Sequence, residues 1–281
     1  MAISLLNNIA SLAAQNQLQV TQGKLQSTLF QLSSGSRINT GADDAAGLAI
    51  ANGLQANVTA LSQSANNANN GVGALQVSDG ALAQVTTLLN RAVTLATESA
   101  NGTVSDSQRT ALNAEFTQIK AEIDRIGSST TFNGTSVFTA TATNIFLSDA
   151  SSAAANNTIS VTVGALSSSS IGYNGSTVSF AADNLSTSAA AVTSLADINN
   201  AISNVAGLRG TIGAGVNRLQ SAVNVINSQV QNLTAAQDAI TSANIPQQVT
   251  NLSEYSILNQ SGISALAQAN SSQQSILKLL Q

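Results

Sequence analysis

Apolar residues in the last third of the chain recur at alternating intervals of three and four, and this spacing constrains the fold most. The pattern runs from Leu195 to Ile240, and only Arg209 and Gln237 interrupt it with polar side chains. A 3-4 spacing averages 3.5 residues, the repeat by which α-helices bury a continuous seam against one another. The sequence therefore predicts a long helix that needs a partner along its whole length.

A second run of the same spacing begins at Val249 and is out of step with the first. Between the runs stands Pro246, the single proline of the chain, and proline is poorly tolerated inside a helix. We therefore expect a break and then a terminal helix, which carries two adjacent apolar stripes. A helix that is apolar on two faces needs more than one partner, so we expect its seam to join copies of the chain. The predicted polymerisation seam comprises Val249, Leu252, Tyr255, Leu258, Ile263, Leu266, Ile276, Leu277 and Leu280.

The N-terminal half carries two further helical patterns. Residues up to about Ser34 place apolar side chains on one helical face. After a turn-like segment, Asp43 and Asp44 suit a helix N-terminus, where backbone amides and the helix dipole favour negative charge. A 4-3 pattern from Leu54 to Ala96 then predicts a very long helix between about residues 44 and 100.

A third helix is predicted from local signals. Ser105 and Gln108 have the spacing of a capping box, which satisfies two free amides at a helix start. An apolar seam follows, and we expect Gly127 to end the helix. Arg209 interrupts one long seam and Asp79 the other, so an ion pair between them is conceivable, although the register of the two helices is open.

The amino-acid composition changes between about residues 128 and 194, where Ser, Thr, Asn and Gly dominate and the helical period of apolar residues is lost. Ile159, Val161 and Val163 alternate with polar residues, as in a half-buried strand, and Val178 and Phe180 do the same. Asn133-Gly134 and Asn174-Gly175 are typical hairpin turns. We predict a small β region with one or two hairpins, whereas residues 148–156 could equally be disordered.

These patterns predict a mainly α fold, an elongated antiparallel helical bundle or coiled coil with a small β-hairpin region at the middle of the chain. Residues 1–42 and 241–281 are expected to form a terminal helical pair. Residues 43–240 are expected to form a rod of long helices that includes the β region at about 128–194, with that region capping the far end.

The composition excludes several functional classes. Charged residues make up 8% of the chain, against about 25% in typical globular domains, and the net charge is −4. No basic surface for nucleic acid or anionic lipid is therefore expected, and no apolar stretch is long enough to span a membrane. The chain has no Cys and no His, which removes thiol nucleophiles, imidazole catalysis and the usual zinc ligands. We expect no enzymatic activity, no cofactor and no cleaved secretory signal, since no basic residue precedes Lys24.

Nine segments, in chain order, carry a family resemblance: SLAAQNQL (11–18), LSSGSRINTGADDAAGLAIA (32–51), SDGALAQV (78–85), LLNRAVTLATESANGT (88–103), EIDRIG (122–127), TFNGTSVF (131–138), GAGVNRLQSAVNVI (213–226), NLTAAQDAI (232–240) and SALAQANSSQQSILKLL (264–280). Together they resemble bacterial flagellin, and they cover both ends and all the long helices. The short middle implies the inner helical parts plus a β region, without large outer domains. The segment 241–248 departs from the family pattern, so its local shape is not predicted.

The resemblance implies a structural subunit of the bacterial flagellar filament. Such a subunit is exported unfolded without a cleaved signal and assembles into an extracellular helical tube that acts as a passive propeller. The terminal helical pair would form the inner core of the filament. The implied partners are further copies of the chain, the flagellar export apparatus and its chaperone, and the hook-associated and cap proteins.

The resemblance also implies a contact patch for the animal Toll-like receptor that senses flagellin. Arg91, Leu95 and Glu115 match the Arg, Leu and Glu of that patch by position. The competing interpretation is that Arg91 and Glu115 are ordinary surface or interhelical charges, which contribute little by themselves.

Three other functions remain as alternatives. A hook–filament junction protein shares the terminal helices but forms a short joint of few copies. A secreted adhesin or innate-receptor ligand would depend on residues 139–193. Some flagellins carry a zinc peptidase in the middle of the chain, but a chain without His has no HExxH motif.

Overall fold

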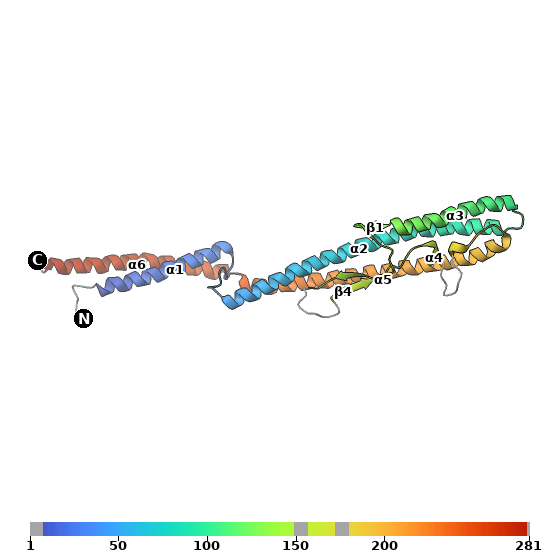
Figure 1. Ribbon diagram of the computed structural model, residues 1–281. Coiled ribbons are helices and arrows are strands. Elements are labelled where there is room, and N and C mark those ends of the chain that lie inside the picture. The colour runs from blue at the N-terminus through green and yellow to red at the C-terminus, as the bar shows by residue number, and fades with distance from the viewer. Residues whose placement is uncertain (1–7, 149–156, 172–179, 280–281) are drawn as a thin grey trace. The chain divides into compact units, whose positions relative to one another are not determined.

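The computed structural model describes residues 8–148, 157–171 and 180–279. Helices dominate this part of the chain, and two small antiparallel strand pairs lie in its middle, which confirms the predicted mainly α fold (Figure 1). The helices are α1 (Ile9–Ser34), α2 (Ala45–Ala100), α3 (Asp106–Ser129), α4 (Ser168–Ile171), α5 (Ser188–Thr241) and α6 (Ile245–Leu279), with a 3-10 turn η1 (Phe180–Ala182). The strands are β1 (Thr131–Phe132), β2 (Thr135–Ser136), β3 (Thr143–Phe146) and β4 (Thr158–Val161).

The chain divides into two compact units, and the boundaries between them along the sequence fall inside α2 and α5. Unit 1 comprises residues 1–56 and 232–281, and unit 2 comprises residues 57–231. Each unit thus combines segments from both halves of the chain.

Unit 1 is built on the antiparallel pair α1 and α6, which lie side by side in Figure 1. Asn8 begins α1 by accepting a hydrogen bond from the Ser11 amide, and its Nδ2 also donates to the Ala269 carbonyl of α6. Gly35 ends α1 with a positive φ of 70°, a conformation that costs glycine least.

The predicted helical break before Pro246 is confirmed. Helix α5 ends at Thr241, α6 begins at Ile245, and Pro246 lies in the first turn of α6, where a missing amide hydrogen costs nothing. The Arg37 amide donates to the Thr241 carbonyl at 2.8 Å, and the Ala243 amide donates to the Gly35 carbonyl at 2.9 Å. The turn after α1 therefore holds the linker between α5 and α6 in place.

The two acidic residues before α2 accept hydrogen bonds from different segments of the backbone. Asp44 Oδ1 accepts a hydrogen bond from the Gly47 amide, so it caps the first turn of α2 as predicted. Asp43 Oδ2 instead accepts from the amides of Asn39 and Thr40, closing the loop that precedes the helix. These hydrogen bonds lower the pKa of Asp43, so the loop is stabilised by the ionised carboxylate.

The core of unit 2 lies where α2, α3 and α5 pack together. Leu82, Leu89 and Ile198 are fully buried there. Phe116 of α3 and Phe180 of η1 are also fully buried and meet edge to face, with ring centroids 5.6 Å apart. The seam residues predicted from the 3-4 spacing therefore face one another within the chain along this unit.

The register between α2 and α5 is marked by an ion pair. Arg209 donates to both carboxylate oxygens of Asp79, with Nε–Oδ1 at 2.7 Å and Nη2–Oδ2 at 3.2 Å. The pairing lowers the pKa of Asp79, and both side chains are about 40% exposed. The two charged interruptions of the apolar seams, Arg209 and Asp79, therefore satisfy each other at the edge of the core.

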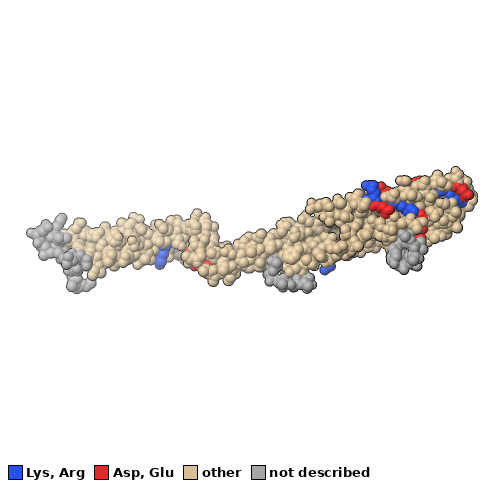
Figure 2. All heavy atoms as spheres, in the orientation of Figure 1, with Lys and Arg blue, Asp and Glu red and all other residues tan. Residues whose placement is uncertain are grey.

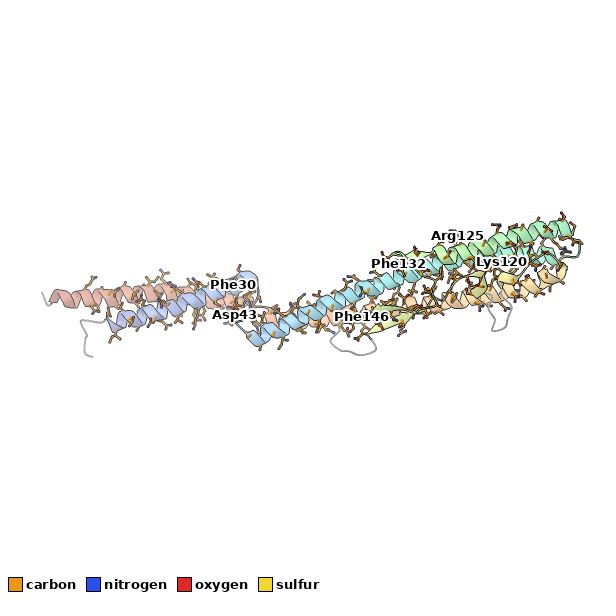
Figure 3. The ribbon with its side chains drawn as sticks, in the orientation of Figure 1. Phe30, Asp43, Lys120, Arg125, Phe132 and Phe146 are labelled. Carbon is orange, nitrogen blue, oxygen red and sulfur yellow. The ribbon has the colours of Figure 1, made fainter. Side chains whose placement is uncertain are left out.

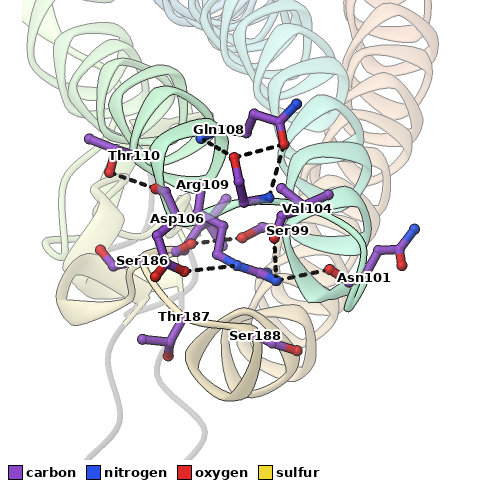
Figure 4. Close-up of polar contacts among 12 residues, drawn as sticks. Ser99, Asn101, Val104, Asp106, Gln108, Arg109, Thr110, Ser186, Thr187 and Ser188 are labelled. Carbon is purple, nitrogen blue, oxygen red and sulfur yellow. Dashed lines mark hydrogen bonds and ion pairs between the residues drawn. The ribbon is translucent and has the colours of Figure 1, made fainter.

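The turn between α2 and α3 is organised by buried Arg109 (Figure 4). Its Nη2 donates to the carbonyls of Asn101 and Val104, at 2.9 and 3.0 Å. The predicted capping box is present, because Ser105 and Gln108 each accept the other's amide hydrogen. Arg109 thus joins the end of one helix to the start of the next.

Gly127 does not end α3, contrary to the prediction from sequence, because the helix continues to Ser129. A Cβ atom at Gly127 would collide with the Leu166 carbonyl. Glycine at this position is therefore explained by a close approach of a second backbone segment rather than by helix termination.

The strands form two separate pairs. Asn133 and Gly134, both with positive φ, make the predicted turn of the β1–β2 hairpin. Strand β4 lies within the predicted alternation, but its partner β3 was not predicted. Phe180 lies in a 3-10 turn rather than a strand, and the second predicted turn, Asn174-Gly175, falls outside the described residues.

The β region does not cap the end of unit 2, contrary to the prediction. The β3–β4 pair packs against the sides of the long helices, with Ile145 beside Gly71 of α2 and Val161 beside Gly215 of α5 (Figure 1). The small residues of both helices leave room for these strands.

Candidate assembly surface

Exposed apolar side chains are concentrated in unit 1. Among the described residues, 11 of the 15 large apolar side chains that are exposed belong to this unit. Ile38 and Ala51 are its only described apolar residues in the buried class, so the unit has almost no core of its own. Exposed apolar surface concentrated in one unit indicates a site of association with another molecule.

Helix α1 is apolar on two opposite sides. The side that faces α6 is built of residues spaced three and four apart, including Leu18, Leu25 and buried Thr28. On the other side of the helix, four large apolar residues remain exposed by 52% to 70%: Ile9, Leu12, Val20 and Phe30. Phe30 is labelled in Figure 3. Only the inner side of α1 has a partner within the described chain.

Helix α6 packs against α1 through a face whose residues belong alternately to the first and the second of its two predicted apolar stripes. Of the predicted polymerisation seam, Leu252, Tyr255 and Leu266 are half-buried on the face toward α1. Val249, Leu258 and Ile263 are exposed by 46%, 44% and 53%. The side chains of Ile276 and Leu277 are not among those described, and Leu280 lies outside the described residues.

The sequence analysis missed part of this surface. Ile257 is 66% exposed on the side of α6 away from α1, yet it belongs to neither predicted stripe. Val20 and Phe30 on the exposed side of α1 were not identified either, because the apolar residues of that side are irregularly spaced. A helical projection, in which successive residues lie about 100° apart around the axis, would have shown that the apolar residues of each exposed side lie together.

The helical pair carries few charges that association would have to desolvate. Lys24 of α1 lies over the ring of Tyr255 of α6, 5.8 Å from its centroid. Figure 2 shows that charged side chains gather over α3 and the adjoining end of α2 instead. Apolar faces without charges are suited to the central part of a protein interface.

The predicted receptor residues do not form one exposed patch. Arg91 Nε donates to Glu115 Oε1 at 2.7 Å, and this exposed pair raises the pKa of Arg91 and lowers that of Glu115. Leu95 is fully buried in the core of unit 2. The accessible part of this surface is therefore the Arg91–Glu115 pair.

A groove of about 720 Å³ lies between α2 and the two strand pairs, and none of its described lining residues is charged. Phe132 and Phe146, on either side of it, are labelled in Figure 3. The described residues include no cluster of three acidic, His or Cys side chains that could hold a metal ion. No described helix is both long and apolar enough to cross a bilayer.

Models of one protein family match both ends of the chain. Residues 5–143 match the model of the bacterial flagellin N-terminal helical region, and residues 195–280 match that of the C-terminal helical region. These matches include all of α1 and α6 and most of the helices of unit 2.

Relatives match along the whole length. The chain is 32% identical to the flagellar filament 30.7 kDa core protein of Treponema maltophilum over 98% of both chains. It is 31% identical to the flagellin of Listeria innocua over 97% of this chain and 98% of that one. A putative flagellar hook-associated protein from Vibrio parahaemolyticus shares the fold, with 16% identity, a TM-score of 0.58, and coverage of 71% of this chain and 100% of the other. The chain belongs to the bacterial flagellin family.

Proposed function

We propose that this chain is the structural subunit of a flagellar filament, in which copies associate through the exposed apolar sides of α1 and α6. The observation that carries the proposal is the outward apolar side of a helical pair that has almost no core of its own. Membership of the flagellin family supports self-assembly into a filament of identical subunits. Repeated contacts between different surfaces of one subunit generate such an open helical polymer.

In this proposal the terminal segments, residues 1–42 and 241–281, form the inner core of the filament, and residues 43–240 form the surrounding rod. The subunit is exported unfolded through the flagellar apparatus with its chaperone, meets the hook-associated and cap proteins, and becomes part of the extracellular flagellum. The filament acts as a passive propeller. We assign the chain no catalytic role, in keeping with a family of structural proteins.

Recognition by a Toll-like receptor would use a smaller surface than the three predicted contact residues would form together. Arg91 and Glu115 are accessible but already paired with each other, whereas Leu95 would have to leave the core to be contacted. We therefore propose at most a weak contact there.

Filament formation distinguishes this function from that of a hook–filament junction protein. Purified protein, seeded with fragments of filament, is expected to form long filaments visible by negative-stain electron microscopy. A product limited to short rings or single joints under the same conditions would favour the junction protein instead.

Limited proteolysis is expected to cut the free monomer preferentially in its terminal helices. Helix α1 has one partner helix and little buried apolar surface, and such helices are marginally stable in water. Digestion of the monomer should remove roughly the first and last 35 residues, while unit 2 resists. The same ends should become resistant in the polymer, as mass spectrometry of the fragments would show. Equal protection of the ends in monomer and polymer would contradict the proposed contacts.

A further inference from the structure

Residues 180–187 form a strap, the segment that enters α5 and crosses the helices of unit 2. Phe180 and Leu185 anchor it, and both side chains are fully buried. The Leu185 carbonyl accepts a hydrogen bond from Ser99 Oγ of α2 at 2.7 Å, and the Leu185 amide donates to Asn113 Oδ1 of α3 at 2.8 Å. Ser194 Oγ of α5 donates to the Asn184 carbonyl at 3.0 Å. The strap is thus fastened to all three helices of the core.

Two acidic side chains meet beneath the strap. Asp183 of the strap is 9% exposed and Asp197 of α5 is 8% exposed. The hydrogen bond from Ser194 Oγ to the Asn184 carbonyl joins their two segments, and the Asp197 carboxylate acts on Asp183 at close range. The Oδ2 atom of each is buried and has no hydrogen-bond partner among the described residues. Ionised carboxylates can only accept hydrogen bonds, so the two side chains can share a hydrogen bond only when one of them carries a proton.

The neighbouring charged groups compensate the charge of the pair only in part. Lys120 of α3 donates its hydrogen bonds to the backbone carbonyls of Ala181 and Asp183, at 3.0 and 2.6 Å. Asp124 of α3 lies near Lys120, but its carboxylate accepts from the amide and hydroxyl of Ser168. Arg109, at the start of α3, is bound to the carbonyls of the α2–α3 turn. Burial and the charge of Asp197 raise the pKa of Asp183 from 3.8 to about 6, while Lys120 acts in the opposite direction.

We propose that Asp183 and Asp197 form a proton-binding latch, in which one shared proton fastens the strap to α5 and its loss loosens the strap. The pKa of Asp183 is higher in the closed strap than in an open one, so the closed strap binds the proton more tightly. The stabilisation is therefore complete below pH 3.8 and is lost as the pH rises through about 6. A difference of about two pKa units corresponds to a change of about 100-fold in the opening equilibrium.

Hydrogen exchange of the full-length monomer tests the latch. After correction for intrinsic exchange chemistry, protection of the Leu185 amide is expected to fall by about 100-fold between pH 4 and pH 8. The Val137 amide, which donates to the Thr130 carbonyl away from the strap, should keep its protection. Equal protection of Leu185 at both pH values would overturn the proposal.

Variants and a direct titration separate the latch from a merely structural role. In Asp197→Asn the new amide can donate to the Asp183 carboxylate without a shared proton, so protection of Leu185 should become nearly independent of pH. Glu98→Gln, which removes an exposed carboxylate of α2, should behave like the original chain. Carbon-13 NMR of the unaltered chain should show a carboxyl of Asp183 that titrates near pH 6. Titration near pH 4, or restored protection at pH 8 on adding calcium ions, would refute proton sharing.

Discussion

Replacing Ile257 and Ile263 by aspartate is expected to abolish filament formation while leaving the helical content of the monomer nearly unchanged. Both side chains are more than half exposed in the isolated chain, so neither supports the packing of α6 against α1. Losing the burial of two isoleucines in the polymer costs about 3 kcal/mol at the lower limit, and burying two carboxylates adds to that cost. The critical concentration for polymerisation should rise by at least about 100-fold, measured by sedimentation and electron microscopy after seeding.

The matched control replaces the same two residues by leucine. It keeps the apolar surface and adds no charge, so filaments should still form at a similar protein concentration. Circular dichroism of both double variants would show that the monomers remain helical. Normal polymerisation of the aspartate variant would mean that these sides of α6 do not lie between subunits.

Replacing Phe116 by alanine is expected to produce the largest loss of stability in unit 2. The ring is fully buried, meets Phe180 edge to face and lies 5.0 Å from the Lys120 ammonium group. Removing a buried phenylalanine ring costs about 4 kcal/mol, because apolar contacts are lost and a cavity remains. The thermal midpoint of the unit should fall by roughly 8–16 °C, measured by calorimetry of the monomer.

The control is Phe146→Ala, which removes a ring of the same size from strand β3. Phe146 is 43% exposed, so its loss should cost less than about 1 kcal/mol. A similar fall in the thermal midpoint for both variants would contradict the assignment of the core to the packing of α3 against the strap and the long helices.

Much of the helical framework follows from local signals in the sequence. The 3-4 spacing determines that α2 and α5 need a partner, and the capping box at Ser105 and the proline at position 246 fix where helices begin. Asn133-Gly134 likewise defines a hairpin, since its turn requires positive φ at both residues. Such features depend on neighbours within a few residues, which is why they can be read without the fold.

Strand β3 could not be predicted in the same way. Residues 143–146 show only weak alternation, and pairing with β4 fixes their structure. Gly127 gave a misleading signal because glycine also serves where two backbones approach closely. Pairing and close approach depend on segments distant in the sequence, so local propensity does not reveal them.

The sequence by itself determined a chain of long amphipathic helices with few charges and with neither Cys nor His, because periodicity and composition can be read without the fold. Only the tertiary structure decided which apolar residues remain without a partner: Leu95 is buried, whereas Ile257 and Phe30 are exposed. It also brought Asp183 against Asp197 beneath the strap. The physical reason is that the exposure of a side chain and the pKa of a carboxyl group depend on which segments pack around them. A helical repeat shows which face of a helix is apolar, but it does not show which segment covers that face.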